Sequence, residues 1–329
     1  MPDLLNRAGG MGEIAEVQGP YETAPFGNEL VELAKTNPSI VGLSADMSKY
    51  SDIVPFMKAY PERYFNAGVA EQSAVMMAAG LAKVGKTAFC ATYAAFLSRR
   101  ALDFIAIACA HSKANVKIVA GSPGLVNPYG ATHQSLEDLV VMRSVPDLTV
   151  IDPCDAVELR HAVRAAAATP GTFYIRNLRG KVPVVFDESD FEFVVGKARR
   201  VREGTDVAVI STGFMTERAM KASDTARDLG VSAAVLHVPT IKPLDEQAIV
   251  DIASSVGRVV VVENGLRAGG LGTAVIEVVH DRGIAVPVTR IGLHDRFHPC
   301  GSQAYNEKAF GLDQDAITDA VVTGNWAFA

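Results

Sequence analysis

Short apolar runs alternate with longer segments of helical period along most of the chain. The runs are rich in β-branched residues and are bounded by turn residues, as is typical of buried parallel strands in α/β proteins. In the first half, strands are expected at 39–46, 87–93, 115–121, 148–153 and 172–177. Helices are expected between them, near 27–36, 70–84, 94–110, 135–143 and 155–168. The pattern therefore predicts an α/β domain with helices on both faces of its sheet.

The same alternation returns after an interruption over 179–204, where charge, Gly and Pro break the periodicity. We interpret this stretch as a linker. Further strands are expected at 205–211, 231–238, 258–264 and 286–293, with helices near 216–229, 245–255, 270–282 and 314–323. The sequence thus predicts an α/β fold of two doubly wound domains, at 25–190 and 191–329, preceded by an extension at 1–24.

Composition and charge narrow the class of protein. The 329 residues are 49% hydrophobic and 21% charged, which suits a globular chain of about two domains. A net charge of -6 gives no electrostatic reason to expect a nucleic acid or an anionic membrane as partner. No signal-peptide core and no apolar run of about 18 residues occurs, so we expect a cytoplasmic location without membrane insertion. Reduced thiols fit the four widely spaced cysteines, which lack a CxxC motif: Cys90, Cys109, Cys154 and Cys300.

The first candidate for chemistry is a carboxylate at the start of an apolar segment. Glu71 follows "RYFNAGV" and opens "AEQSAVMMAAGLAKVG". A first-turn acid commonly complements the helix dipole, and this structural role is the more frequent one. However, small residues around it, Gly68, Ala78 and Gly80, would let a flat ligand approach closely. A carboxyl group in such an apolar place could exchange a proton with a ligand nitrogen.

Two further segments place ring side chains where α/β sheets bind ligands. Tyr93 and Phe96 lie three residues apart at the end of a predicted strand and the start of a helix, so both rings could face one pocket. A loop rich in Gly, Pro and Asn then leads to His133, which is a candidate for proton transfer or hydroxyl binding. The other histidines have no metal-ligand spacing, and we expect no metal site in this chain. The only Gly-rich turn before a helix, "RAGGLGTAVIE" at 267–277, is too short a pattern to indicate a phosphate site.

Taken together, four segments resemble the pyrimidine-binding and C-terminal domains of transketolase, particularly the bacterial kind split over two chains. They are "ERYFNAGVAEQ", "ATYAAFLSRRALD", "GATHQSLEDLVVMRSVPDLTVIDPCDAVEL" and "VVVVENGLRAGGLG", in family order from about residue 25 to about 320. The resemblance implies thiamine diphosphate, bound between two chains. It implies that Glu71 hydrogen-bonds the aminopyrimidine and that Tyr93 and Phe96 pack against this ring.

The same resemblance assigns substrate roles. His133 matches a histidine that contacts hydroxyls of the donor and the intermediate. Arg176, in "YIRNLRG", matches an arginine that binds a substrate phosphate, although a surface salt bridge at a strand end is its alternative role. Ser44 and Asp46, in "LSADMS", match a segment that lines the substrate channel. The implied reaction moves a two-carbon ketol unit from a ketose to an aldose.

Three departures from the family pattern qualify these expectations. The chain has no "GDG" with a downstream Asn to hold Mg2+ and the diphosphate, so we expect a partner α chain to carry that domain, in an α2β2 assembly. Tyr129 stands where relatives usually have an aspartate that contacts donor hydroxyls. The segment at 23–25, Thr-Ala-Pro, lacks the arginine that the family often has before its first helix. The last two changes leave the sugar open between a phosphorylated ketose and an unusual, sulfonated or unphosphorylated one.

Three other functions remain possible from the sequence. The β chain of an oxo-acid dehydrogenase first component shares both domains and would pass an acyl group to a lipoyl protein. Deoxyxylulose phosphate synthase has a similar loop before "THQ". A non-catalytic partner subunit would use the fold for dimerisation alone, but it would not need the candidate residues together.

Overall fold

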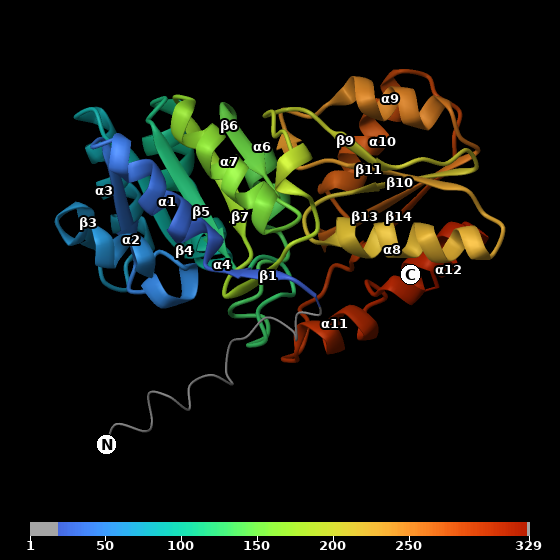
Figure 1. Cartoon of the computed structure of the whole chain (residues 1–329), viewed down its shortest axis with the longest axis horizontal. Coiled ribbons are helices and arrows are strands. Elements are labelled where there is room, and N and C mark those ends of the chain that lie inside the picture. The colour runs from blue at the N-terminus through green and yellow to red at the C-terminus, as the bar shows by residue number, and fades with distance from the viewer. Residues whose placement is uncertain (1–18, 328–329) are drawn as a thin grey trace.

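The structure, a computed structural model, describes residues 19–327 and has two α/β lobes side by side (Figure 1). The first lobe contains a seven-stranded sheet of order β12-β6-β7-β5-β4-β2-β3. All neighbours in this sheet are parallel except β12, which pairs antiparallel with β6. Its strands are β2 (Ile40–Ser44), β3 (Tyr64–Asn66), β4 (Thr87–Tyr93), β5 (Val116–Gly121), β6 (Leu148–Ile151), β7 (Thr172–Asn177) and β12 (Thr240–Lys242).

The second lobe contains a five-stranded sheet of order β14-β13-β10-β11-β9, in which only β9 is antiparallel. A separate antiparallel pair joins β1 to β8. The bounds of these strands are β1 (Tyr21–Thr23), β8 (Lys181–Pro183), β9 (Arg199–Arg202), β10 (Val207–Ser211), β11 (Ala233–His237), β13 (Arg258–Leu266) and β14 (Val288–Leu293).

Helices cover both faces of each sheet because successive side chains of a strand point to opposite faces. In β4, Phe89 packs with the cluster under α1 and α7, whereas the next residue, Cys90, packs with the cluster under α3 and α4. In the second lobe, α8 and α12 lie on one face and α9 and α10 on the other (Figure 1). The helices are α1 (Pro25–Thr36), α2 (Val54–Ala59), α3 (Glu71–Lys83), α4 (Ala94–Arg100), α5 (Leu102–Phe104), α6 (Asp138–Ser144), α7 (Ala156–Ala168), α8 (Met215–Asp228), α9 (Glu246–Ser254), α10 (Leu271–Asp281), α11 (Gln303–Ala309) and α12 (Gln314–Thr323).

The expected fold class is confirmed, with three local differences. The helix expected over 94–110 is interrupted: α4 ends at Arg100 and a π-helix follows at Ile105–His111. The expected linker at 179–204 contains two strands, β8 and β9. The third difference is β12, which comes from the second half of the chain but extends the sheet of the first lobe. The extension expected at 1–24 lies mostly outside the described residues.

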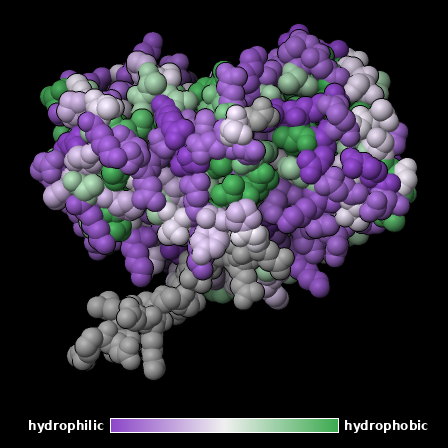
Figure 2. All heavy atoms as spheres, in the orientation of Figure 1, coloured by the Kyte–Doolittle hydropathy of each residue, from purple (hydrophilic) through white to green (hydrophobic). Residues whose placement is uncertain are grey.

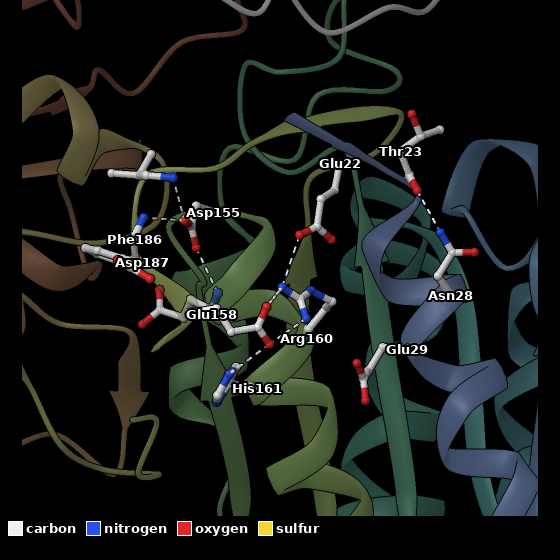
Figure 3. A network of polar contacts seen from close by, with 12 residues as sticks. Glu22, Thr23, Asn28, Glu29, Asp155, Glu158, Arg160, His161, Phe186 and Asp187 are labelled. Carbon is white, nitrogen blue, oxygen red and sulfur yellow. Dashed lines mark hydrogen bonds and ion pairs between the residues drawn. The ribbon is translucent and has the colours of Figure 1, made fainter. Parts of the chain in front are cut away.

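A polar network holds the segment that connects the two lobes, which includes Val185 and Phe186 (Figure 3). Asp155 caps α7 by accepting a hydrogen bond from the Glu158 amide at 2.8 Å, and its second oxygen accepts the amides of Val185 and Phe186. Arg160, one turn further along α7, contacts the carboxylates of Glu22 on β1 and Glu188. The connecting segment and β1 are therefore bound to the same helix, α7.

Apolar contacts continue from one lobe to the other. On the face seen in Figure 2, a group of apolar side chains lies between the lobes, and hydrophilic side chains cover most of the remaining surface. One buried cluster runs from Val75 on α3 and Ile118 on β5 to Ile249 and Val275 in the second lobe. The two lobes thus share a core and do not only touch at their surfaces.

Arg176 is the centre of a buried network at this junction. Its side chain is 1% exposed. Nε donates to Asp138 at 2.9 Å, Nη1 donates to Asp152 at 3.2 Å and to the Asn264 carbonyl of β13 at 3.0 Å, and Nη2 donates to Asp138. The Tyr174 hydroxyl also donates to Asp138, at 2.8 Å. One guanidinium therefore satisfies two buried carboxylates of the first lobe and a carbonyl of the second.

Replacing Arg176 is expected to destabilise the fold strongly. Arg176→Met leaves Asp138 and Asp152 buried without their counterion, and breaking a buried ion pair from one side costs about 3–5 kcal/mol. Urea denaturation followed by circular dichroism measures the change in the free energy of unfolding. Lys35→Met, which removes an exposed pair with Glu32 on α1, serves as the control and should leave the unfolding midpoint unchanged. Equal midpoints for the two variants would contradict the structural role of Arg176.

Another buried carboxyl group occupies the Gly-rich turn that precedes α10. Glu263 is 1% exposed and accepts hydrogen bonds from the amides of Leu271 and Gly272, both at 2.8 Å. A Cβ on Gly270 would lie 1.9 Å from its carboxylate, so only glycine permits this approach. The helix N-terminus at "RAGGLG" is thus occupied by a carboxyl group of its own domain. Burial raises the pKa of Glu263 to about 7 from its usual 4.5.

This shift predicts a pH dependence of stability. Between pH 4.5 and about 7 the folded protein retains a proton on Glu263 that the unfolded chain releases, so the contribution of this residue to stability falls as pH rises through that interval. Glu263→Gln, which cannot titrate, is the reference. Across the interval the free energy of unfolding of the wild type should decline relative to Glu263→Gln by about 1–3 kcal/mol. A wild type that gains stability relative to this variant as pH rises would show the opposite linkage.

Candidate active site

Most of the expected site residues lie at one edge of the seven-stranded sheet. Ser44 ends β2 and Tyr93 ends β4, and these parallel strands have the same direction, so their carboxyl ends are close together. The helix α3 begins with Glu71 shortly after the neighbouring strand β3. Ligands of open α/β sheets bind in crevices outside the carboxyl ends of their strands. The topology therefore brings these residues to the edge where a site is expected.

Glu71 has a charged partner that the sequence reasoning did not anticipate. Its side chain is 2% exposed, but Nη1 of Arg100 donates to both carboxylate oxygens, at 3.1 and 3.2 Å. Arg100 is 48% exposed and its guanidinium lies 4.2 Å from the centre of the Phe96 ring. The expectation of a carboxylate in almost wholly apolar surroundings is therefore wrong. The signal was the pair of arginines at the end of "AAFLSRR", to which we assigned no role.

Ring side chains form a continuous surface beside this ion pair. The Tyr93 and Phe96 rings meet edge to face with centres 5.7 Å apart, and the His133 ring lies 5.9 Å from the first and 5.3 Å from the second. Tyr129 contacts His133 at 5.3 Å, and Tyr50 contacts Tyr93 at 5.9 Å. We call these five residues the aromatic wall. The structure thus brings together Tyr93, Phe96, Tyr129 and His133 as expected, with Glu71 joined to them through Arg100.

Burial shifts the pKa values of two rings of the wall, Tyr93 and His133. Burial raises the pKa of Tyr93 to about 12, so its hydroxyl keeps its proton. Burial, and secondarily the charge of Arg100, lower the pKa of His133 below its usual value, which favours the neutral imidazole. Nδ1 of His133 lies 2.7 Å from the Thr132 hydroxyl, so that contact occupies Nδ1 and Nε2 is left for another ligand. The wall can therefore pack against a neutral ring and hydrogen-bond a hydroxyl.

Ser44 and Asp46 shape the turn after β2. Ser44 is fully buried, and its hydroxyl accepts the Met47 amide at 3.2 Å. Asp46 is paired with Asn66 at the end of β3: its carboxylate accepts from the amide side chain at 3.1 Å. Within residues 19–327, neither side chain hydrogen-bonds to the aromatic wall. These two residues lie at the expected edge but apart from the rings.

Arg176 does not lie with the other site residues. We expected it to bind a substrate phosphate or to form a surface salt bridge, yet its guanidinium is buried and faces Asp138, Asp152 and Asn264. The expectation of a surface salt bridge is wrong. Binding of a substrate phosphate by Arg176 conflicts with its guanidinium donors, which are already hydrogen-bonded inside the protein. Sequence reasoning also missed a second arginine in the same "YIRNLRG" segment. Arg179 lies next to the Tyr50 and Tyr93 rings, three residues beyond Arg176.

The described residues fit one half of a cofactor site. A buried carboxylate beside packed rings suits a heteroaromatic ring with nitrogen donors and acceptors, such as an aminopyrimidine. In the range 19–327, no group of three or more His, Cys, Asp or Glu side chains is placed to hold a metal ion. The same range contains no helix long and apolar enough to span a bilayer.

Comparisons with known proteins agree with this geometry. Residues 22–184 match the family profile "Transketolase, pyrimidine binding domain", and residues 196–317 match "Transketolase, C-terminal domain". A transketolase family protein of Sinorhizobium fredii is 44% identical over 93% of this chain and 90% of its own length. A 6-deoxy-6-sulfo-D-fructose transketolase subunit of a Clostridium species is 39% identical over 88% of this chain and 90% of its own length.

One solved structure matches nearly the whole chain. It is described as a split-gene transketolase in an inactive β4 tetramer, and it is 39% identical with a TM-score of 0.84. The match covers 92% of this chain and 97% of that one. The chain therefore belongs to the transketolase family, of which it contains the pyrimidine-binding and C-terminal domains.

Proposed function

We propose that this chain is the β subunit of a two-chain, thiamine-diphosphate-dependent transketolase that moves a two-carbon ketol unit from a ketose to an aldose. The observation that carries the proposal is the placement of Glu71, buried at the start of α3 and joined through Arg100 to the aromatic wall. A scaffold protein has no need for this arrangement. The transketolase family and the names of its split-chain relatives support the assignment.

In this proposal the chain holds the aminopyrimidine end of the cofactor. Glu71 hydrogen-bonds the ring nitrogen, and Tyr93 and Phe96 pack against the ring. When bound, the cofactor supplies a carbon nucleophile and an electron sink for cleaving the carbon–carbon bond. Before binding, Glu71 accepts hydrogen bonds from Arg100. Because Arg100 is half exposed, its side chain can move toward solvent when the cofactor binds and leave Glu71 to share a proton with the ring nitrogen.

His133 and Tyr129 face the substrate in this proposal. A neutral His133 offers Nε2 to a donor hydroxyl. Tyr129 replaces an acidic acceptor with a bulkier phenol, which changes donor discrimination by a few kcal/mol in a dry site. Ser44 and Asp46 line the channel from the turn after β2. Arg176 is left out of the substrate site because its donors are occupied.

A partner α chain completes the site by holding Mg2+ and the diphosphate, in an α2β2 assembly. Exposed apolar side chains lie just before α3, on α3 and on the neighbouring π-helix, and they offer a surface for such a partner. They are Val69, Met76, Met77 and Ile107, with exposures of 75, 46, 39 and 59%. The split-gene relative described as an inactive β4 tetramer is consistent with a chain that needs a partner for activity.

We place the assembly in the cytoplasm. The four cysteines form no disulfide, and three of them are buried as free thiols. Burial raises the pKa of the Cys90 and Cys109 thiols to about 12, so they are unreactive core residues. Free thiols of this kind suit a reducing compartment.

A deoxyxylulose-phosphate-synthase-like enzyme is the second candidate. Synthases of this kind are 35–38% identical to the chain, which spans 45–49% of their lengths, so such an activity would also need a second chain. The two candidates differ in their donor, a keto acid for the synthase and a ketose for the transketolase. An oxo-acid dehydrogenase would require a lipoyl protein, and a non-catalytic subunit would not use Glu71.

Co-expression with the chain encoded beside it tests the split-site proposal. The two chains should co-purify and together transfer a ketol unit in a panel of ketose donors and aldose acceptors. The β chain alone, with added cofactor and Mg2+, should be inactive because it lacks the diphosphate-binding half. Turnover of sugars by the isolated β chain would refute the proposal, and turnover only with pyruvate as donor would favour the synthase.

Replacing Glu71 in the assembled enzyme tests its catalytic role. Glu71→Gln preserves size but cannot share the proton, so kcat should fall by about 10²–10⁴ while the assembly still forms. Glu29→Gln is the matched control, because Glu29 is also buried on a helix and paired with an arginine, Arg164, at 2.7 and 2.8 Å. Its kcat should stay at the wild-type value. Near-normal turnover of Glu71→Gln would remove Glu71 from this role.

A further inference from the structure

The loop that carries His133 is long and irregular. It runs from the end of β5 at Gly121 to the start of α6 at Asp138, and in the described structure its only regular pairing is an isolated bridge between Gly124 and Ser135. A loop longer than about 12–15 residues without secondary structure is uncommon, and holding it in one shape costs conformational entropy. The place of His133 in the aromatic wall therefore depends on contacts that fix this backbone.

One side chain of the neighbouring helix α4 binds the loop on both sides of His133. Nη1 of Arg99 donates to the Ala131 carbonyl and Nη2 donates to the Gln134 carbonyl, each at 2.8 Å. Nε and Nη2 also donate to the carboxylate of Glu137, the second of these bonds at 3.1 Å. All three nitrogens of this guanidinium are therefore bonded to the loop. We call this set of contacts the Arg99 clamp.

The pairing with Glu137 orients the guanidinium of Arg99. Glu137 directly precedes α6, but its side chain makes no capping hydrogen bond to that helix. The two side chains are 31% and 26% exposed, and an ion pair as exposed as this adds little to stability. A two-point contact with a carboxylate does, however, fix the plane of the guanidinium fork. The remaining N–H groups are thereby directed at the two carbonyls.

Other contacts of the loop do not replace this clamp. The side chain of Gln134 donates to the Pro299 carbonyl at 3.3 Å, and the Gly301 amide donates to the Pro128 carbonyl at 3.1 Å, so the second lobe also holds the loop. In the described part of the chain, however, Arg99 is the only donor to the carbonyls that flank the imidazole. Removing its side chain would leave this part of the backbone without those bonds.

The next residue of α4 binds the other part of the site. Arg100 contacts Glu71 and lies over the Phe96 ring, whereas Arg99 binds the loop. Consecutive residues of a helix project about 100° apart, so the two arginines reach opposite sides of α4. Phe96 is on the same helix, and its ring centre lies 5.3 Å from that of His133. The last turn of α4 therefore links the carboxylate of the site to the imidazole.

We propose that Arg99 is a positioning residue, which holds His133 against the aromatic wall and so determines how efficiently the enzyme uses its ketose donor. This inference rests on the proposed function, in which His133 hydrogen-bonds a donor hydroxyl. Arg99 acts through the two carbonyls beside His133 and does not itself bind the donor. A misplacement of a binding group by about 1 Å can cost about 100-fold in rate, so loss of the clamp should impair donor use.

A double-mutant cycle in the assembled enzyme tests this role. Arg99→Gln should lower kcat/KM for the preferred ketose donor by about 10- to 100-fold, while the affinity for thiamine diphosphate stays at the wild-type value. Arg99→Lys cannot reach both carbonyls and Glu137 together, so it should recover only part of the loss. In the His133→Ala background, Arg99→Gln should cause no further loss, because the clamp acts only through the imidazole.

Arg202→Gln is the matched control. Arg202 on β9 is 32% exposed, against 31% for Arg99, and pairs with Asp224 through two bonds of 2.9 and 3.0 Å in the second lobe. Its kcat/KM should equal that of the wild type. An unchanged kcat/KM in Arg99→Gln would overturn the inference. So would losses from Arg99→Gln and His133→Ala that add fully in the double variant, because Arg99 would then act independently of the imidazole.

Hydrogen exchange separates this inference from the proposed function. In the assembled protein, mass spectrometry should show amides of residues 130–135 exchanging at least about tenfold faster in Arg99→Gln than in the wild type, with no change in Arg202→Gln. If the wild type turns over no ketose, the transketolase proposal fails, whereas faster exchange would still support the clamp. Equal exchange in the three proteins would refute the clamp. If Arg99→Gln does not assemble, Glu137→Gln should show the same effects in smaller measure, and its wild-type behaviour in both measurements would refute the inference.

Discussion

The geometry of the sheet edge that carries the candidate site depends on the hydrogen bonds of one buried guanidinium. Arg176 lies near the end of β7 and binds Asp138 on α6, Asp152 after β6 and the Asn264 carbonyl on β13. A charged group in this interior is tolerated only with all its acceptors in place, so the interaction specifies position as much as it adds stability. It fixes the first sheet, the helix that follows the His133 loop and the second lobe relative to one another.

Three arginines near this edge differ in function because they differ in partners. Arg176 has its donors occupied inside the protein and acts on structure. Arg100 is half exposed and holds the buried carboxylate of Glu71. Arg99 is partly exposed and binds the backbone on both sides of His133. The residue type alone does not separate these roles; the acceptors within reach do.

The sequence predicted what depends on local pattern. Long buried strands such as β4 and β5 were found because their apolar runs are continuous, and the start of α3 at Glu71 followed from the first-turn acid. The three-residue strands β1, β8 and β12 were missed, since so short a segment has no period and exists only through its partner strand. The pairing of Glu71 with Arg100, 29 residues later, is likewise tertiary. Resemblance to a family pointed to Tyr93, Phe96 and His133, whose rings are in contact, but could not show that Arg176 faces inward.

Within the proposal, the chain contributes half of a cofactor site: a carboxylate and a wall of rings for the pyrimidine, without the groups for the diphosphate. Calorimetric titration of thiamine diphosphate with Mg2+ into the β chain, the partner chain and their assembly tests this division most directly. Saturable binding by the assembly alone, weakened in Glu71→Gln, is the expected result. Tight binding by the isolated β chain, or binding by the assembly that is insensitive to Glu71, would contradict it.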